Sequence, residues 1–180
     1  MGETQKSVIV VGSRVLNEAR FMQLFLDNHP FADHIVLMDG GSTDRSKEIA
    51  EKAPRVVWKA FKKRAPGKSK GWRNPEGLHV RATIDAMEEL QPDWLFFTEI
   101  DVVPNRALQH NLRDIFTEME TADQQSLQTH MYYVAPDGGS HYPQLIVGHG
   151  YTAWKPGKGY PTDLDYPFNG RGSINVTVPE

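Results

Sequence analysis

The chain has 180 residues, of which 39% are hydrophobic, and this content can fill one core of ordinary size. We therefore expect a single domain over residues 1–180. A formal net charge of -3 gives no overall attraction to nucleic acid or to an anionic membrane. The absence of cysteine excludes a disulfide framework, a thiolate metal site and a thiol nucleophile.

The first third of the chain alternates between strand-like and helix-like patterns. Short β-branched or apolar runs predict strands, and amphipathic segments predict helices between them. These elements are expected over residues 7–13, 17–29, 34–39, 40–53 and 55–61. Asn17 is the expected cap of the first helix, and Ser42 or Thr43 that of the second.

The same alternation continues after a long loop. The expected elements are a loop over 62–75, a helix over 76–90, a strand that ends at Glu99, a helix over 106–119, and strands over 126–134 and 142–149. Strands that alternate with helices form a mostly parallel sheet between two helical layers. We therefore predict an α/β fold of this kind.

Polar segments follow three of the predicted strands. They are "VLNEAR", "DGGSTD" and "TEIDVVPN". In an open α/β sheet, ligands bind beyond the carboxyl ends of the strands, so these segments predict a binding site. Glu99 and Asp101 are two residues apart, and in an extended chain both carboxylates would lie on one face. This spacing fits a metal site, or a strand end that only solubilises the chain.

These motifs together resemble those of the family 2 glycosyltransferases, which have a Rossmann-like GT-A fold. The matching positions are Asn17 with Glu18, residues 39–44, Arg81, and Glu99 with Asp101. The resemblance covers roughly residues 7 to 105. It implies a nucleotide-binding half over 1–105, an acceptor-side half over 106–180, and transfer of a sugar from a UDP-sugar to an acceptor hydroxyl with inversion.

The residue chemistry and the resemblance together suggest roles for the individual side chains. Asp39 could accept a hydrogen bond from a base, and a divalent cation, Mn²⁺ or Mg²⁺, would need the oxygen ligands that Asp101 and Glu99 offer. Because Glu99 stands where the family usually has Asp, we expect Asp101 to be the dominant ligand. The expected donor-binding residues are Ser13, Arg14, Asn17, Glu18, Asp39, Gly41, Ser42, Arg81 and Glu99.

Inverting transfer also needs a general base on the acceptor side. The candidates are His149, which is flanked by glycines, and Asp163 with Asp165, and the sequence does not choose among them. His130 and His141 are further candidates for the base or the metal. Aromatic residues of the segment 150–172 could contact a sugar or pack on the core: Tyr151, Trp154, Tyr160 and Tyr166.

Other interpretations stay open. Asp44 fits a helix N-terminus as well as a ligand site, and Arg81 fits a solvated helix face. The basic segment 62–75, with Trp72, could close over a donor, or it could contact DNA in a transferase that modifies a base. A nucleotidylyltransferase and a nucleotide-binding domain without catalysis are further alternatives.

The sequence also bears on location. "MGETQKSVIVVGS" lacks a charged stretch followed by a long apolar one, and no apolar run reaches the roughly 18 to 20 residues of a membrane span. We therefore expect a cytoplasmic protein with no membrane span.

Overall fold

The computed structural model describes residues 6–61, 75–124, 126–128, 152–156 and 173–175. Their helices and strands, in chain order, are β1 (Ile9–Val15), α1 (Ala19–Asn28), β2 (His34–Asp39), α2 (Ser46–Ala50), β3 (Val56–Ala60), α3 (Pro75–Glu88), β4 (Trp94–Phe97), α4 (Arg106–Thr121), β5 (Ser126–Gln128), β6 (Thr152–Trp154) and β7 (Ser173–Asn175). No helix among these residues is long and apolar enough to cross a membrane.

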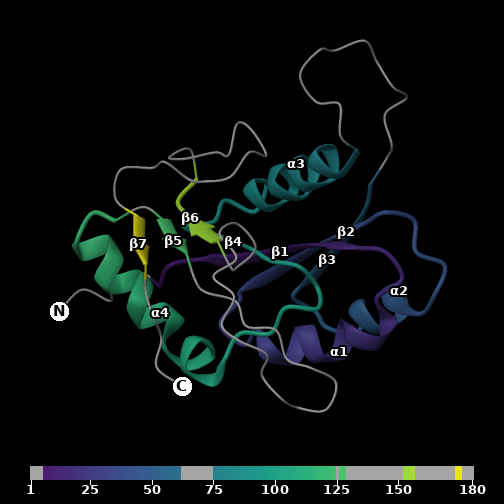
Figure 1. The fold of residues 1–180 in the computed structure, drawn as a ribbon, viewed down its shortest axis with the longest axis horizontal. Helices are drawn as coiled ribbons and strands as arrows, with labels where there is room; N and C mark the ends of the chain where they lie inside the picture. Colours follow the sequence, from purple (N-terminus) through teal and green to yellow (C-terminus); the bar gives the residue numbers. More distant parts are fainter. Residues whose placement is uncertain (1–5, 62–74, 125, 129–151, 157–172, 176–180) are drawn as a thin grey trace, which may run out of the picture.

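The strands form one sheet in the order β3-β2-β1-β4-β6-β5-β7 (Figure 1). The pairs β1–β2, β2–β3, β1–β4 and β5–β7 are parallel, and β6 runs antiparallel to β4 and to β5. The predicted α/β fold with a mostly parallel sheet is confirmed. The carboxyl ends of β1, β2 and β4 lie side by side, so the loops that follow them meet at one edge.

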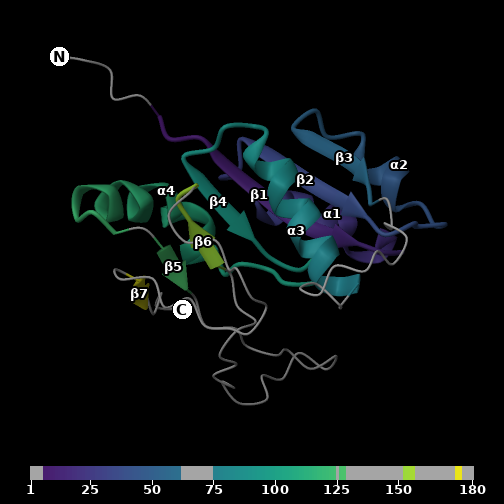
Figure 2. The same cartoon turned by 90° about the horizontal axis from the view of Figure 1, so that it is seen from above.

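Helices cover both faces of this sheet. One face packs on α1 and α4, through apolar side chains such as Phe25, Leu112 and Phe116. The other face packs on α3, which lies across β1, β2 and β4 in Figure 2. Gly12 of β1 permits this close approach, because a Cβ built there would lie 2.1 Å from Sδ of Met87. Alternate residues of each strand thus reach opposite cores.

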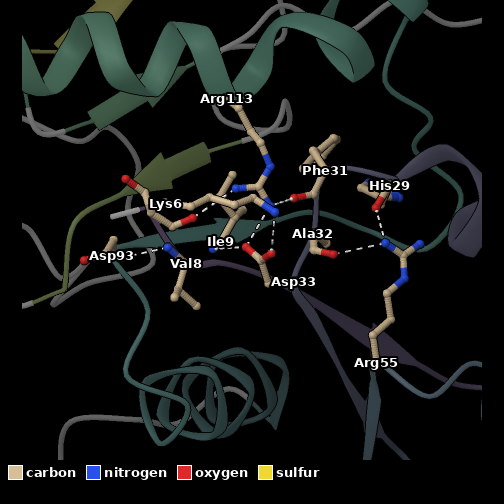
Figure 3. Close-up of polar contacts among 11 residues, drawn as sticks. Lys6, Val8, Ile9, His29, Phe31, Ala32, Asp33, Arg55, Asp93 and Arg113 are labelled. Atoms are coloured by element: carbon tan, nitrogen blue, oxygen red, sulfur yellow. Dashed lines mark hydrogen bonds and ion pairs between the residues drawn. The ribbon is translucent and has the colours of Figure 1, made fainter. Parts of the chain in front are cut away.

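The amino end of the sheet is held by two arginines (Figure 3). Arg113 of α4 donates to the Asp33 carboxylate at 2.7 Å and to the carbonyl of Ser7 at 3.0 Å. The same Asp33 oxygen accepts from the backbone N–H of Ile9 at 2.9 Å. Arg55 donates to the carbonyls of Leu26, His29 and Ala32 at and beyond the end of α1. These contacts satisfy backbone groups that a helix end leaves without partners.

Several local expectations were wrong. Asn17 does not cap α1: Glu18 is the N-cap residue, and Asn17 has a left-handed backbone with a φ of 58°. Neither Ser42 nor Thr43 caps α2, which begins only at Ser46 and has 5 residues. The side chains of these residues instead bond across the two loops.

The second half of the chain also differs from the expectation. β4 ends at Phe97, two residues before Glu99, and β6 lies within a segment expected to be an aromatic loop. Trp154 of β6 is buried in the core beneath α3, so it is not exposed for a sugar. Of the strand expected over 126–134, β5 covers Ser126–Gln128. The strand expected over 142–149 lies outside the described residues.

Candidate functional site at the carboxyl edge of the sheet

The loops after β1 and β2 are bound to each other through Asn17. Its backbone N–H donates to Oγ of Ser42 at 2.9 Å, and its Oδ1 accepts from the backbone N–H of Thr43 at 2.8 Å. The left-handed backbone of Asn17, a conformation that Asn tolerates better than most residues, turns the side chain toward the second loop. Asn17 therefore shapes the edge of the site.

Asp44, in the loop after β2, and Ser46, the first residue of α2, both bond to the N-terminus of α1. Oδ2 of Asp44 accepts from the N–H of Ala19 at 3.0 Å, and Oγ of Ser46 accepts from the N–H of Glu18 at 2.8 Å. The hydroxyl of Ser46 also donates to Asp44 at 2.6 Å, and this bond is the main reason that the pKa of Asp44 is lowered. Asp44 therefore bonds to a helix N-terminus, as one interpretation of the sequence expected, and the helix is α1.

Asp39 stands at the carboxyl end of β2 with its two oxygens in different situations. Oδ1 accepts from the N–H of Gly41 at 3.1 Å and of Ser42 at 2.8 Å, a local turn that fixes the carboxylate. Gly41 has a φ of 107°, which a side chain would strain. Oδ2 has no hydrogen-bond partner within the described part of the chain, so it can accept from a ligand.

Arg14, near the end of β1, forms an ion pair with Glu99 beyond β4. The Arg14 side chain is largely covered, and the Glu99 side chain is about half exposed. Glu99 begins a turn in which the N–H of Val102 donates to its carbonyl at 3.2 Å, and Asp101 lies exposed in that turn. The expectation that an extended strand aligns Glu99 with Asp101 was therefore wrong, although both do follow β4 at the predicted edge.

Carboxylates crowd the space between these loops. Burial raises the pKa of Glu18, and the negative charges of Asp101, Asp44 and Glu99 raise it further, while Arg20 acts in the opposite direction. The acids of three separate segments therefore lie within electrostatic reach of one another. Such repulsion is relieved when a cation binds among them.

The described residues fit a divalent cation site in which the protein supplies only one or two of the ligands. The described residues contain no group of three or more His, Asp or Glu side chains placed to hold a metal. A Mg²⁺-type site needs only one or two carboxylates when phosphate oxygens and water complete its shell. Asp101 is exposed and suits this task, whereas Glu99 already pairs with Arg14.

The remaining predicted residues fall into two groups. Ser13 is buried and its hydroxyl donates to the carbonyl of Arg14 at 3.2 Å, while Arg81 on α3 donates to Asp85 at 2.9 Å. The candidate bases and the basic segment lie outside the described residues: His149, Asp163, Asp165, His130, His141 and 62–74.

His79 of α3 is a member of this site that the sequence reasoning missed. Its Nε2 lies 2.7 Å from the carbonyl oxygen of Met38, and its ring stacks on Phe61 with centroids 4.5 Å apart. The available signal was its position four residues before Thr83, a spacing that places both side chains on one face of the helix expected over 76–90. Thr83 is buried in the structure.

Fold comparisons agree with this architecture. No family model and no curated protein matches the sequence. Glucosyl-3-phosphoglycerate synthase from Mycobacterium tuberculosis, in complex with uridine diphosphate, is similar over 83% of this chain and 57% of its own, with a TM-score of 0.55 and 18% identity. A second structure of that enzyme gives a TM-score of 0.54 at 19% identity, covering 83% of this chain and 58% of its own.

A third solved structure, described only as a mycobacterial protein, covers 82% of this chain and 53% of its own, with a TM-score of 0.50 and 17% identity. The chain therefore spans less than two thirds of the length of these structures. At such identities the likeness concerns the fold, and that fold is the GT-A type of α/β architecture.

Proposed function

We propose that this chain is a GT-A glycosyltransferase that moves a sugar from a nucleotide diphosphate donor, a UDP-sugar, to an acceptor hydroxyl with inversion and with Mn²⁺ or Mg²⁺. Residues 1–105 would bind the donor and 106–180 the acceptor. The observation that carries the proposal is Asp39, whose carboxylate is fixed at the end of β2 with one oxygen left for a ligand. The M. tuberculosis enzyme of similar fold was solved with Mn²⁺ and uridine diphosphate, which supports the same ligand class here.

The geometry of Asp39 favours a particular type of base. A carboxylate oxygen can only accept a hydrogen bond, so it pairs with a ring N–H donor such as N3–H of uracil. The N3 atom of cytosine is itself an acceptor and would face the carboxylate without a proton between them. We therefore expect uridine to bind better than cytidine, with Gly41 and Ser42 holding the carboxylate in place.

The diphosphate needs positive charge from groups other than the N-terminus of α1. The N–H groups of Glu18 and Ala19, which could bind an anion in other nucleotide sites, already donate to Ser46 and Asp44. A cation held by Asp101 would supply this charge and stabilise the leaving diphosphate. Arg14 lies at the same edge, beside Glu99.

The acceptor must lose a proton on the face opposite the leaving group. Asp163, Asp165 and His149 remain our candidates for the base, because each offers a titratable group in the acceptor-side half. Substituting them one at a time in the active protein separates them: loss of kcat with an unchanged KM for the donor identifies the base.

A screen of nucleotide sugars for slow hydrolysis tests the proposal, because water can replace the acceptor when none is supplied. We expect release of uridine diphosphate from one UDP-sugar in the presence of Mn²⁺. Asp39→Asn should lower the rate by about tenfold. The amide nitrogen would replace Oδ2, so a donor N–H would face the N–H of the base where the carboxylate oxygen accepted a hydrogen bond. Asp114→Asn on the exposed face of α4 is the matched control. Hydrolysis that Asp39→Asn leaves unchanged would contradict the assignment.

A further inference from the structure

His79 reaches from α3 to the strand that carries Asp39. A backbone carbonyl can only accept a hydrogen bond, so the 2.7 Å separation from the Met38 oxygen places a proton on Nε2 of His79. Met38 directly precedes Asp39 in β2. The imidazole is therefore bonded to the chain one residue away from the proposed ligand contact.

The same ring has two close neighbours. Phe61 stacks against it at an interplanar angle of 14°, and the N–H of Phe61 donates to the carbonyl of Asp39 at 2.8 Å. Gly40 also lies near the ring, because a Cβ added there would be 3.3 Å from Cε1 of His79 and 3.4 Å from the carbonyl of Val15. His79, Phe61 and Gly40 thus lie together at the end of β2.

Burial is the main influence on the pKa of this ring. Burial lowers the pKa of His79, and Arg14 lowers it further, while the bond to Met38 and the carboxylates of Glu99 and Asp39 act in the opposite direction. A neutral ring with its proton on Nε2 donates to Met38 and adds no charge beside Arg14.

We propose that His79 is a positioning residue for nucleotide binding: its Nε2–H bond to Met38 and its place beside Gly40 hold the turn over residues 39–42, so that Oδ2 of Asp39 faces the base. The ligand part rests on the proposed function above. The turn itself can be measured without any ligand, through the two amides that donate to Asp39.

The experiment compares His79→Phe, which keeps a flat ring against Phe61 but removes the Nε2–H donor, with His79→Gln, which keeps an N–H donor at a similar reach. Ile84→Val, a buried position on the same helix, is the control for a general loss of packing. Two quantities are measured: hydrogen exchange of the Gly41 and Ser42 amides in the free protein, and the affinity for uridine diphosphate with Mn²⁺.

We expect His79→Phe to speed exchange of both amides and to weaken nucleotide binding, each by about tenfold, as for the loss of one hydrogen bond. His79→Gln should recover most of both, and Ile84→Val should change neither. Exchange that stays unchanged in His79→Phe overturns the proposal, whatever happens to binding. If even the unmodified protein binds no nucleotide, the proposed function fails, while the exchange comparison still decides the role of His79.

Discussion

Two carboxylates, Asp33 at the amino end of the sheet and Glu18 at the carboxyl end, have pKa values shifted in opposite directions. At the amino end, hydrogen bonds from Ile9 and Arg113 overcome the effect of burial and lower the pKa of Asp33, so its charge is stabilised. At the carboxyl end, burial and nearby carboxylates raise the pKa of Glu18. The charge of Asp33 is therefore favourable in the folded protein, whereas that of Glu18 is unfavourable, although its neighbour Asp44 is stabilised by Ser46. A cation bound beside Glu18 would relieve the repulsion. Local instability of this kind is typical of functional sites.

The largest effect should come from His29, at the end of α1. The ring is buried against Phe25 and its pKa falls to about 4, chiefly because of burial. Above pH 6.5 it is neutral in both states, and between pH 6.5 and 4 only the unfolded chain takes up a proton. The free energy of unfolding should therefore fall by about 3 kcal/mol across this range. Urea titrations at several pH values measure it.

His29→Gln provides the comparison for this pH dependence. The variant is expected to be less stable at pH 7, and its stability should change less between pH 6.5 and 4. An identical slope in both proteins would mean that other groups cause the acid sensitivity.

Arg113→Met should lower the free energy of unfolding by about 2 kcal/mol, because it removes the charged partner of the partly buried Asp33 carboxylate, which keeps the N–H of Ile9, and the guanidinium donor of two backbone carbonyls. Chemical denaturation at pH 7 checks this value. Affinity for uridine diphosphate in the folded variant should be unchanged, since the carboxyl edge is not touched. A loss of affinity would show that the two ends are coupled.

Asp39 gives a smaller effect at the opposite end. We expect uridine diphosphate to bind about tenfold more tightly than cytidine diphosphate, the difference expected from one well-placed hydrogen bond. Competition binding measures the ratio. Asp39→Asn should reduce this preference with little loss of stability, because an amide oxygen can still accept from Gly41 and Ser42.

Glu18→Gln should have the smallest effect and the opposite sign. Because the pKa of Glu18 is raised in the folded protein, the free energy of unfolding falls as the pH rises and Glu18 ionises. The neutral Gln side chain avoids this loss. A gain of a few tenths of a kcal/mol at pH 7 is expected. The same change should weaken Mn²⁺-dependent binding of nucleotide. A variant less stable than the parent would contradict the picture of a carboxyl edge held under like-charge repulsion.

Much of the fold could be predicted from local patterns. The apolar run 34–39 coincides with β2, and the periodic segment 76–90 corresponds to α3. β6 was missed because three strand residues within a Gly- and Pro-rich segment carry no periodic signal, and pairing with β4 and β5 fixes them. The topology of a parallel sheet then brought Arg14, Asp39 and Glu99 to one edge, as the order of motifs indicated.

The finer chemistry of the site depends on contacts that sequence spacing does not contain. The Arg14–Glu99 pair joins residues 85 positions apart, so it follows from the pairing of β1 with β4. The two-residue spacing of Glu99 and Asp101 suggested one strand face, but the chain turns after Phe97. His79 was missed for the same reason: its partner, Met38, lies 41 positions away.

The central claim is that the carboxyl edge binds a nucleotide diphosphate together with a divalent cation. Calorimetry with uridine diphosphate, in the presence of Mn²⁺ and after its removal with a chelator, tests this claim most directly. We predict binding that weakens by at least about tenfold without the metal, and an Asp101→Asn variant that shows the weak affinity in both conditions while Asp114→Asn behaves like the parent. Equal affinity with and without Mn²⁺, unchanged in Asp101→Asn, would contradict the account.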